Sequence, residues 1–413
     1  MKPVVVLGAS LSGMAAVESM RGTGYDGPLV VLDPSETLPH DRPPLTKQVL
    51  SGEWPLERAE QPVAARLASL DLDLRLGVGA AGLDAKRRSL ALSDGTTLDA
   101  SAVLVATGSH ARRLPLSRQG EPGAGTFVVR TGADSVALRD RLEHTDGPVV
   151  VIGAGFIGAE VAATCRRLGF EVTILEAAPV PLQRVLPGDV GSFVADLHRA
   201  HGVDVRLGTV IEAIETGADG SPHGVRLADG SLIEAAVVVE GVGAAPSVAW
   251  LEGSGLELLE PARGGGVLCD ASLLAHPGVV AAGDLAAWPN PHFGGEVMRV
   301  EHWENAIESG THAGRRVLAE VEGSSLGNND PFDSLPWFWS DQYDAKIQMV
   351  GRSGPDDEAV FVDGEPGSER FVVLFRRAGR CSAALGVGRP RLVMQARMKM
   401  AESLDWDGVA ALF

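Results

Sequence analysis

The sequence predicts an α/β protein built largely from two copies of one strand–loop–helix unit. Residues 4–16 read VVVLGASLSGMAA and residues 149–163 read VVVIGAGFIGAEVAA. In each stretch an apolar, β-branched run leads into a glycine-containing loop, and a helix-like pattern follows. Such apolar runs are typical of strands buried on both faces of a parallel sheet. The duplication therefore indicates two related α/β domains in one chain.

The composition is that of an acidic globular protein. The chain has 413 residues, 45% of them apolar, which is enough for two or three domains with a large core. Its net charge of −18 argues against a nucleic-acid binder, whose surface would be basic. No apolar run reaches about 18 residues, and the Met-Lys-Pro start leads directly into a strand-like run instead of a signal-peptide pattern. We therefore expect a cytoplasmic protein without a membrane span.

Cysteine chemistry is not indicated. The three cysteines are Cys165, Cys269 and Cys381. They form no C-x-x-C pair and no metal-ligand spacing, so we expect neither a redox dithiol nor a metal site. Cys165 shares a helical spacing with Ile157, Val161 and Leu168, which is typical of a packed core thiol and not of a nucleophile.

The first glycine loop predicts a nucleotide cradle. Gly8, Ser10 and Gly13 follow the strand-like run at residues 4–7 and form G-x-S-x-x-G. A G-x-S-x-G hydrolase elbow does not fit, because Ser12 stands where its second glycine would be. The pattern matches the dinucleotide fingerprint with a serine in the middle, where a pyrophosphate approaches the helix N-terminus less freely than at a glycine.

An acid at the end of the next strand supports this interpretation. The run at residues 29–32 reads as a strand and Asp33 ends it, where a carboxylate can bind a ribose hydroxyl. The alternative, a glycine turn in an unrelated α/β fold, stays open on these residues alone.

The second loop is a complete fingerprint. Its glycines are Gly153, Gly155 and Gly158. They lie between a strand at residues 149–152 and a helix, and Glu176 ends the next strand at residues 172–175. Glu176 is expected to accept hydrogen bonds from the adenosine ribose and to repel a 2′-phosphate. No Lys or Arg occurs in AAPVPLQ after it, so we expect NADH over NADPH.

Two fingerprints suggest a retained cofactor and an exchanging one. FAD with a nicotinamide nucleotide is the natural pair, because a flavin accepts a hydride and can release electrons singly. An apolar strand within residues 100–109 ends in ATG, and another within residues 276–288 ends in Gly283 and Asp284. Asp284 could hold a ribityl hydroxyl or simply cap a helix.

Further blocks resemble one enzyme family over essentially the whole chain. They are DRPPLTK (41–47), ATG (106–108), the second fingerprint with its following AE, GVGAAP (241–246), AAGD (281–284), RVEHWENA (299–306) and PWFWSDQYDAKIQ (336–348). With these blocks the sequence resembles the FAD-dependent NADH–ferredoxin reductases of bacterial oxygenase systems, the group of putidaredoxin reductase and the aromatic dioxygenase reductases. Apoptosis-inducing factor is a more distant relative.

The resemblance implies a glutathione-reductase-like architecture with two Rossmann-like domains and a C-terminal α+β domain. The implied segments are 1–115 and 246–325 for FAD, 116–245 for NADH, and 326–413 for the C-terminal reductase domain. Residues 320–331 read as a polar linker. Residues 68–84 and 197–215 look like equivalent helix–strand segments, which suggests an old duplication.

The resemblance also implies roles for individual residues. Lys47 would reach the reactive edge of the flavin and pair with Glu160 near the nicotinamide, where a cation stabilises the reduced ring. A surface ion pair, and for Glu160 a favourable helix-dipole position, are the alternatives. The remaining FAD contacts implied by the family or the fingerprint are Arg42, Ala80, Ala106, Thr107, Gly108, Arg130, Gly283, Asp284 and Trp303. Trp339 would lie beside flavin and nicotinamide, and Ile157, Arg184 and Gly243 would line the NADH site.

The function implied is electron transfer from NADH through FAD to an iron–sulfur ferredoxin that serves a haem monooxygenase or a ring-hydroxylating dioxygenase. The region PHDRPPLTKQVL lacks the reactive cysteine of related disulfide reductases, so no thiol relay is expected. The alternatives are a rubredoxin reductase, an NADH oxidase, or an NADH-sensing flavoprotein like apoptosis-inducing factor. A hydrolase using Ser10 is more remote.

One segment is a candidate docking surface. Residues 370–399 contain eight Arg or Lys and no Asp or Glu, although the whole chain is acidic. Because ferredoxins are generally acidic, this segment could attract one. Alternatively its arginines are scattered over several solvated faces, since successive strand residues alternate sides.

Overall fold

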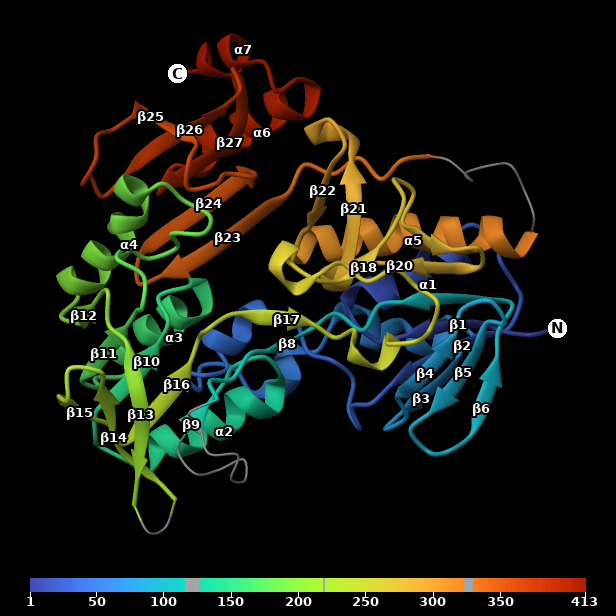
Figure 1. The fold of residues 1–413 in the computed structure, drawn as a ribbon, viewed down its shortest axis with the longest axis horizontal. Helices are drawn as coiled ribbons and strands as arrows, with labels where there is room; N and C mark the ends of the chain where they lie inside the picture. Colours follow the sequence, from blue (N-terminus) through green and yellow to red (C-terminus); the bar gives the residue numbers. More distant parts are fainter. Residues whose placement is uncertain (116–125, 218–219, 323–329) are drawn as a thin grey trace. The chain divides into compact units, whose positions relative to one another are not determined.

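The computed structural model describes residues 1–115, 126–217, 220–322 and 330–413 (Figure 1). The chain forms two compact units. The first contains Met1–Asp41, Glu60–His110 and Ala245–Pro336, and the second contains Arg42–Ala59, Ala111–Ala244 and Trp337–Phe413. Within the described ranges, no helix has the length and apolar character needed to cross a bilayer.

The first unit is organised around a six-stranded sheet with the order β19-β20-β7-β1-β2-β3. Its strands are β1 (Val4–Leu7), β2 (Leu29–Asp33), β3 (Asp73–Leu76), β7 (Ala102–Val105), β19 (Leu274–His276) and β20 (Val279–Ala281). All are parallel except β19, and β1 lies between β2 and β7. The four residues of β1 are fully buried, as an all-apolar central strand requires.

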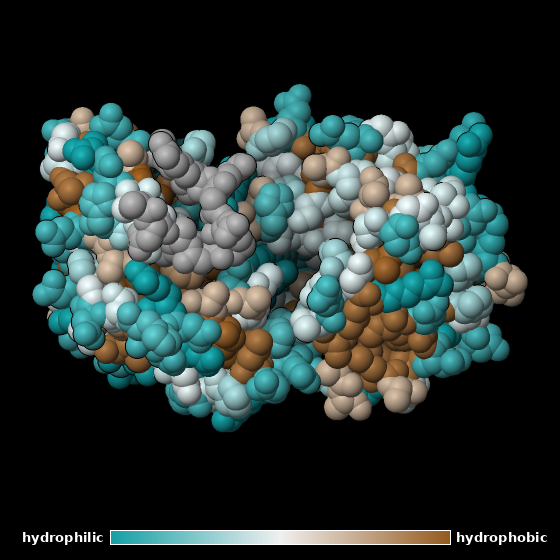
Figure 2. Space-filling view, turned by 90° about the horizontal axis from the view of Figure 1, so that it is seen from below, coloured by the Kyte–Doolittle hydropathy of each residue, from teal (hydrophilic) through white to brown (hydrophobic). Residues whose placement is uncertain are grey.

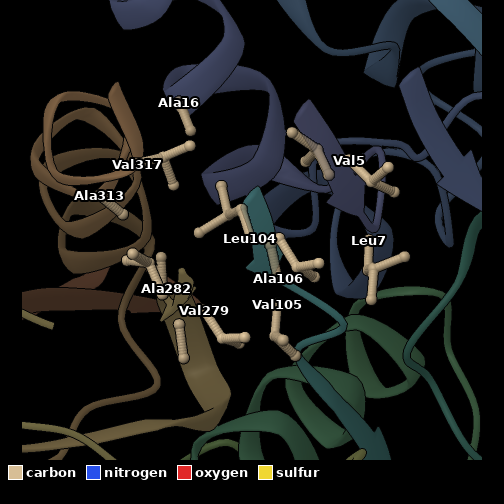
Figure 3. Packing of buried hydrophobic residues seen from close by; sticks show 14 of the residues in the cluster. Val5, Leu7, Ala16, Leu104, Val105, Ala106, Val279, Ala282, Ala313 and Val317 are labelled. Carbon is tan, nitrogen blue, oxygen red and sulfur yellow. The ribbon is translucent and has the colours of Figure 1, made fainter. Parts of the chain in front are cut away.

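Two helices of the first unit pack closely because small residues separate them. They are α1 (Leu11–Gly22) and α5 (Trp303–Glu322). A Cβ at Gly310 would overlap the Ser12 carbonyl, and one at Gly314 would approach the Ala16 carbonyl oxygen to 2.6 Å. Figure 3 shows Ala313 and Val317 beside Ala16 and above the strand residues Leu104 and Val279. The core thus begins where the two helices meet the sheet.

Smaller antiparallel sheets complete the first unit. They contain β4 (Ala80–Asp84), β5 (Ser89–Leu92), β6 (Thr97–Asp99), β18 (Val267–Leu268), β21 (Ala286–Asn290) and β22 (Glu296–Arg299), with β18 parallel to β21. The strand predicted to end at Gly283 and Asp284 is β20, which ends at Ala281. A 3₁₀ turn at Gly283–Leu285 follows it, and Gly283 there has a φ of 76°.

The second unit repeats the same topology. Its five-stranded parallel sheet has the order β12-β11-β10-β16-β9. The strands are β9 (Thr126–Phe127), β10 (Val149–Ile152), β11 (Val172–Leu175), β12 (Asp204–Arg206) and β16 (Val237–Glu240), with an antiparallel sheet of β13 (Ile211–Thr216), β14 (Pro222–Leu227) and β15 (Leu232–Glu234). Strands β10, β11, β12 and β16 correspond in order to β1, β2, β3 and β7. This order agrees with the predicted duplication.

The helices of this half are α2 (Gly132–Glu143), α3 (Phe156–Arg167) and α4 (Gly188–Ala200). Cys165 and Val161 on α3 are buried, but Ile157 and Leu168 are 46% and 44% exposed. The predicted four-residue core stripe on this helix is therefore only half right, because those two residues lie beyond its packed face.

A five-stranded antiparallel sheet, β23-β24-β27-β26-β25, forms the C-terminal part of the second unit. Its elements are β23 (Trp337–Gln342), β24 (Ala345–Gly351), β25 (Glu358–Asp363), β26 (Phe371–Arg377), β27 (Arg380–Val387), α6 (Pro390–Glu402) and α7 (Trp406–Ala410). Leu186 and Val190 share one apolar cluster with Phe371 and Phe375 of this sheet. That cluster joins the sheet to the segment leading into α4.

Two short connections lie at the change from one unit to the other. The strands β8 (Ser109–Ala111) and β17 (Ala244–Pro246) pair with each other. The stretch Arg42–Ala59 belongs to the second unit because Leu45, Val49 and Leu50 are buried in its core.

The predicted linker at 320–331 begins inside α5, and its residues 323–329 lie outside the described residues. On the face drawn in Figure 2, hydrophilic side chains alternate with apolar patches.

Candidate functional site

The first glycine loop is packed so closely that its glycines cannot be replaced. Gly8 has a φ of 105°, and a Cβ there would lie 2.5 Å from the Ala106 carbonyl oxygen. A Cβ at Gly13 would overlap the Gly8 carbonyl. The loop between β1 and α1 therefore brings the start of the helix directly over the end of the sheet, as a dinucleotide fold requires.

Ser10 is used to begin the helix. Its Oγ donates to the Ala106 carbonyl at 2.9 Å and accepts from the Gly13 amide at 3.2 Å. The hydroxyl also lies 3.3 Å from the Ser12 hydroxyl. A nucleophilic serine needs an adjacent base, and none of these three contacts of Ser10 is to a base. The hydrolase alternative therefore has no support in this loop.

Asp33, the last residue of β2, and Glu176, the residue after β11, stabilise their glycine loops in the same way. Asp33 accepts from the amides of Ala9 at 2.8 Å and Ser35 at 2.9 Å. Glu176 accepts from the amides of Ala154 at 2.7 Å and Ala178 at 2.8 Å. Burial raises the pKa of Asp33, whereas the two amide hydrogen bonds act in the opposite direction. Both acids therefore hold the fingerprint loop in addition to any contact with a ribose.

The second loop has the same close contacts but leaves space at its middle glycine. A Cβ at Gly153 would lie 2.5 Å from the Gly241 carbonyl oxygen, and one at Gly158 would overlap the Gly153 carbonyl. At Gly155 the nearest atom, the Gly241 oxygen, would be 3.8 Å away. Protein packing thus does not require a glycine there. The bare Cα instead leaves room for a phosphate at the start of α3, so the residues fit a dinucleotide.

This difference predicts opposite effects for two alanine substitutions. We expect Gly155→Ala to fold normally and to raise the KM for NADH about tenfold, because only the ligand occupies that space. Gly158→Ala should instead lower the free energy of unfolding by about 1–3 kcal/mol, because the methyl group collides with backbone. Urea unfolding and NADH kinetics of both variants check this. Equal loss of stability in the two proteins would contradict it.

A second group of predicted residues gathers near β7 and β20 in the first unit. Asp284 is 8% exposed and accepts a hydrogen bond from Ser109 at 2.8 Å. The Thr107 hydroxyl donates to the Ser247 carbonyl at 3.0 Å, and Gly108, with a φ of 65°, accepts from the Ser247 amide. The Asp284 carboxylate is thus buried at the carboxyl end of β20, where ligands of open α/β sheets bind.

Lys47 and Glu160 lie together inside the second unit. Their Nζ and Oε2 atoms are 2.6 Å apart, and the two side chains are only 13% and 7% exposed. A surface ion pair is therefore excluded for them. Thr46 donates to the same carboxylate oxygen at 2.6 Å, and Ser340 donates to the other oxygen at 2.7 Å. Three donors converge on one carboxylate at Glu160, the fifth residue of α3. The first turn of α3 carries no acidic residue, so the predicted helix-dipole position of Glu160 is wrong.

Local structure explains why Lys47 reaches this position. The 3₁₀ turn Pro43–Thr46 begins with two prolines, whose fixed φ suits such a turn. Ser135 of α2 donates to the Leu45 carbonyl at 2.6 Å, and Thr164 of α3 donates to the Thr46 carbonyl at 2.7 Å. These bonds tie the turn to both helices and place Lys47 over the start of α3.

The other predicted residues are distributed over both units. In the first unit Ala80 begins β4, and Trp303 begins α5 with its indole nitrogen donating to Asp41 at 2.6 Å. In the second unit Arg42 precedes the 3₁₀ turn and Trp339 lies on β23, its ring 5.1 Å from that of Trp337. The remaining predicted positions of this unit are Arg130 after β9, the exposed Arg184 between β11 and α4, and Gly243 after β16 with a φ of 101°.

Four polar residues near these sites were missed by sequence reasoning. Thr46 and Ser340 stand inside the matched blocks DRPPLTK and PWFWSDQYDAKIQ, so the blocks themselves carried a signal. Ser109 follows ATG directly. Gln342 also stands in the second block, but nothing in its spacing distinguishes it from an ordinary strand residue.

The cysteines are inert, as predicted for Cys165. Burial raises the pKa of Cys165 and of Cys381 to about 12, and it also raises the pKa of Cys269. All three are free and buried. Thiolates are the reactive form of cysteine, so none of these thiols is suited to relay electrons. Within the described ranges, no group of three or more His, Cys, Asp or Glu residues is placed to hold a metal ion.

The fold and its loops define a class of protein: an oxidoreductase with two dinucleotide-binding domains and a C-terminal α+β sheet. Residues 2–310 match the family model of pyridine nucleotide-disulphide oxidoreductases, and residues 337–411 match the reductase C-terminal family. The chain belongs to the pyridine nucleotide-disulphide oxidoreductase family, and it is an FAD-dependent enzyme that uses NAD(H).

Three similar proteins span nearly the whole chain. The ferredoxin reductase subunit of 5,5'-dehydrodivanillate O-demethylase from Sphingobium sp. is 35% identical over 98% of this chain and 94% of its own. The ferredoxin–NAD(+) reductase component of the anthranilate 1,2-dioxygenase system of Burkholderia cepacia is 34% identical over 97% and 94%. The crystal structure of the covalent putidaredoxin reductase–putidaredoxin complex matches with a TM-score of 0.88 and 29% identity, over 97% of this chain and 93% of that one.

Proposed function

We propose that this protein passes electrons from NADH through FAD to an iron–sulfur ferredoxin that serves a haem monooxygenase or a ring-hydroxylating dioxygenase. The observation that carries this proposal is the whole-chain likeness to ferredoxin reductase components of oxygenase systems, in a chain with two dinucleotide loops. The partner class is supported by the similarity to a reductase solved in complex with putidaredoxin.

We assign the two cofactors to the two loops. Residues 1–115 and 246–325 would hold FAD, residues 116–245 NADH, and residues 326–413 would form the C-terminal reductase domain. The flavin supplies the change from two-electron to one-electron transfer. Ser10 and Asp33 shape the first loop, and Gly155 and Glu176 shape the second. Ser10 places a side chain at the centre of the first loop, so a pyrophosphate approaches this loop less freely than one with a central glycine. Such a loop suits a cofactor that stays bound.

The buried Lys47–Glu160 pair would supply the charge at the reaction centre. Glu160 holds the ammonium group of Lys47 at a fixed position, 2.6 Å from its own carboxylate. A preorganised cation in a water-poor site stabilises negative charge without having to reorganise. By family resemblance we place this cation at the reactive edge of the flavin, with Trp339 beside it.

An anaerobic absorbance titration with NADH tests the proposed function. We expect a yellow protein that is bleached by about one equivalent of NADH and then reoxidised by a ferredoxin. Faster reoxidation by dioxygen than by ferredoxin would favour the NADH oxidase alternative, and rubredoxin in place of ferredoxin would favour a rubredoxin reductase. A slowly decaying charge-transfer complex without turnover would favour the NADH sensor. NADPH should be used poorly, since Glu176 would repel its 2′-phosphate.

The basic segment at residues 370–399 is only partly available for docking. Arg377 is bound through two hydrogen bonds to Asp357, and Arg389 is paired with Asp363. Lys399 pairs with Glu402 at 3.0 Å. Arg376 lies over the Trp406 ring, 3.9 Å from Glu358, and Arg380 is exposed at the start of β27, directly after the β26–β27 turn. Pairing within the chain thus reduces the positive charge that this segment presents.

We nevertheless propose the β26–β27 turn as part of the ferredoxin surface, and Arg380 tests it. Arg380→Glu should raise the KM for an acidic ferredoxin about tenfold at low salt and leave NADH-to-dye activity unchanged. Arg377→Glu is unsuitable, because it would place a second negative charge beside the buried Asp357 carboxylate and remove its counter-charge. Arg263→Glu, in the first unit, is the matched control for an exposed arginine elsewhere. An unaltered KM in Arg380→Glu would remove the turn from the docking surface.

We keep the cytoplasm as the proposed location, because NADH is generated there and the enzyme consumes it.

A further inference from the structure

A buried chain of polar side chains extends from Glu160 across the second unit. Ser340 on β23 donates to Glu160, and Gln342, two residues further along the same face of β23, lies 3.2 Å from Ser340. His198 on α4 lies 3.2 Å from Gln342 through its Nε2 atom. Its Nδ1 atom lies 2.9 Å from the Tyr343 hydroxyl. The chain therefore connects α3, β23 and α4.

The direction of every hydrogen bond in this chain follows from the charge of Glu160. A carboxylate paired with Lys47 cannot donate, so the Ser340 proton points to Glu160. Ser340 can then only accept from Gln342, which must present its amide nitrogen to Ser340 and its oxygen to His198. His198 consequently carries its proton on Nε2.

The state of His198 fixes the last bond. His198 is 1% exposed, and burial lowers its pKa to about 4, so it is neutral at pH 7. A neutral ring with a proton on Nε2 accepts at Nδ1, so the Tyr343 hydroxyl donates to it. All four bonds thus point in one direction, from Tyr343 through His198, Gln342 and Ser340 toward Glu160.

Tyr343 is held in place at a conformational cost. Its φ is 55°, a left-handed value that is unfavourable for an aromatic residue, and it lies in the turn between β23 and β24. Its ring is stacked on His201, with centroids 3.6 Å apart and planes 5° from parallel. Such strain persists only where the surroundings over-determine the conformation. The stacking and the bond to His198 supply that constraint.

We propose that Tyr343, His198, Gln342 and Ser340 form an oriented hydrogen-bond chain that holds the Glu160 carboxylate in place against Lys47. These four are positioning residues, and the role of Glu160 itself rests on the proposed function. Aligned hydrogen bonds strengthen one another in a poorly solvated interior, so the carboxylate gains more than one neutral donor would supply. The titratable groups that face His198 are Tyr343 and His201, and Asp344 lies 3.9 Å from His201.

The first test determines the tautomer of His198 and does not require the enzyme to turn over. In ¹⁵N-labelled FAD-loaded protein, long-range ¹⁵N–¹H correlation at pH 7 should show one histidine as the neutral Nε2–H tautomer, unchanged down to about pH 5. That signal should disappear in His198→Gln, which assigns it. An Nδ1–H tautomer or an imidazolium at pH 7 would overturn the orientation of the chain.

The second test is the pH dependence of flavin reduction by NADH. Ser340→Ala removes the last donor, so the acid limb of the rate–pH profile should move up by about one unit, as loss of a hydrogen bond to a charged group predicts. Ser340→Thr keeps the hydroxyl and should restore the profile. The matched control is Ser382→Ala, which removes a buried serine whose hydroxyl donates to Asp357 at 2.9 Å. This substitution should leave the rate–pH profile unchanged.

The outcomes separate the two proposals. An acid limb at the same pH in Ser340→Ala and in the unmodified protein would overturn the positioning role, even if NADH reduces the flavin normally. A flavin that NADH does not reduce in the unmodified protein would instead refute the proposed function, while the tautomer of His198 would still decide the orientation. If Ser340→Ala fails to fold, Gln342→Leu tests the same bond one step away.

Discussion

Replacing Lys47 with alanine should slow the reduction of the bound flavin by NADH by about 10²–10³-fold, the usual effect of removing one preorganised charge from a reaction centre. The reason is the burial of the pair, because the Lys47 ammonium lies 2.6 Å from the Glu160 carboxylate and both side chains are nearly inaccessible. Water cannot replace the missing charge as it would at the surface. Stopped-flow absorbance under anaerobic conditions measures the rate.

The same substitution should also destabilise the second unit. Without Lys47, Glu160 keeps the Thr46 and Ser340 donors but loses its counter-charge. Removing one partner of a buried pair typically costs about 3–5 kcal/mol. Arg226→Ala is the matched control, because its pair with Glu215 is 39% and 32% exposed and should contribute less than about 1 kcal/mol.

Two results would contradict the role of Lys47. A variant that is reduced as fast as the unmodified protein would show that its charge does not act on the reaction. A variant whose stability falls while its rate per folded molecule stays unchanged would show that the pair serves the fold alone. Lys47→Met, which keeps an unbranched side chain only one atom shorter and removes the charge, separates charge from packing.

Acidification from about pH 6.5 to 4 should destabilise the protein through two buried histidines. Burial lowers the pKa of His198 and of His302 from 6.5 to about 4. In this interval both are neutral in the folded protein and protonated in the unfolded chain. The unfolded state therefore binds more protons, and the free energy of unfolding falls as the pH falls.

The expected loss is on the order of 3 kcal/mol for each histidine across the interval. Urea unfolding at several pH values measures it. His198→Gln should remove about half of the pH dependence, whereas His223→Gln, at an exposed position on β14, should leave it unchanged. A pH dependence that is the same in all three proteins would contradict the assignment and would point to the paired carboxylates instead.

The features that the sequence determined by itself are those formed by neighbours along the chain. The strand at Val4–Leu7, its copy at Val149–Ile152, and the acids Asp33 and Glu176 all belong to compact βαβ units of about 30 residues. Glycine spacing and apolar runs report such local geometry directly, because a Cβ at Gly8 or Gly153 would collide with backbone.

Only the tertiary structure decided which polar groups surround Glu160. Thr46 lies 114 residues before it and Ser340 lies 180 residues after it, and no periodicity links positions so far apart. The same holds for the basic segment, where Asp357 neutralises Arg377 from a neighbouring part of the sheet. Charge and burial in a folded protein depend on contacts made across the sheet, and a single sequence shows the residues without the contacts that set their chemistry.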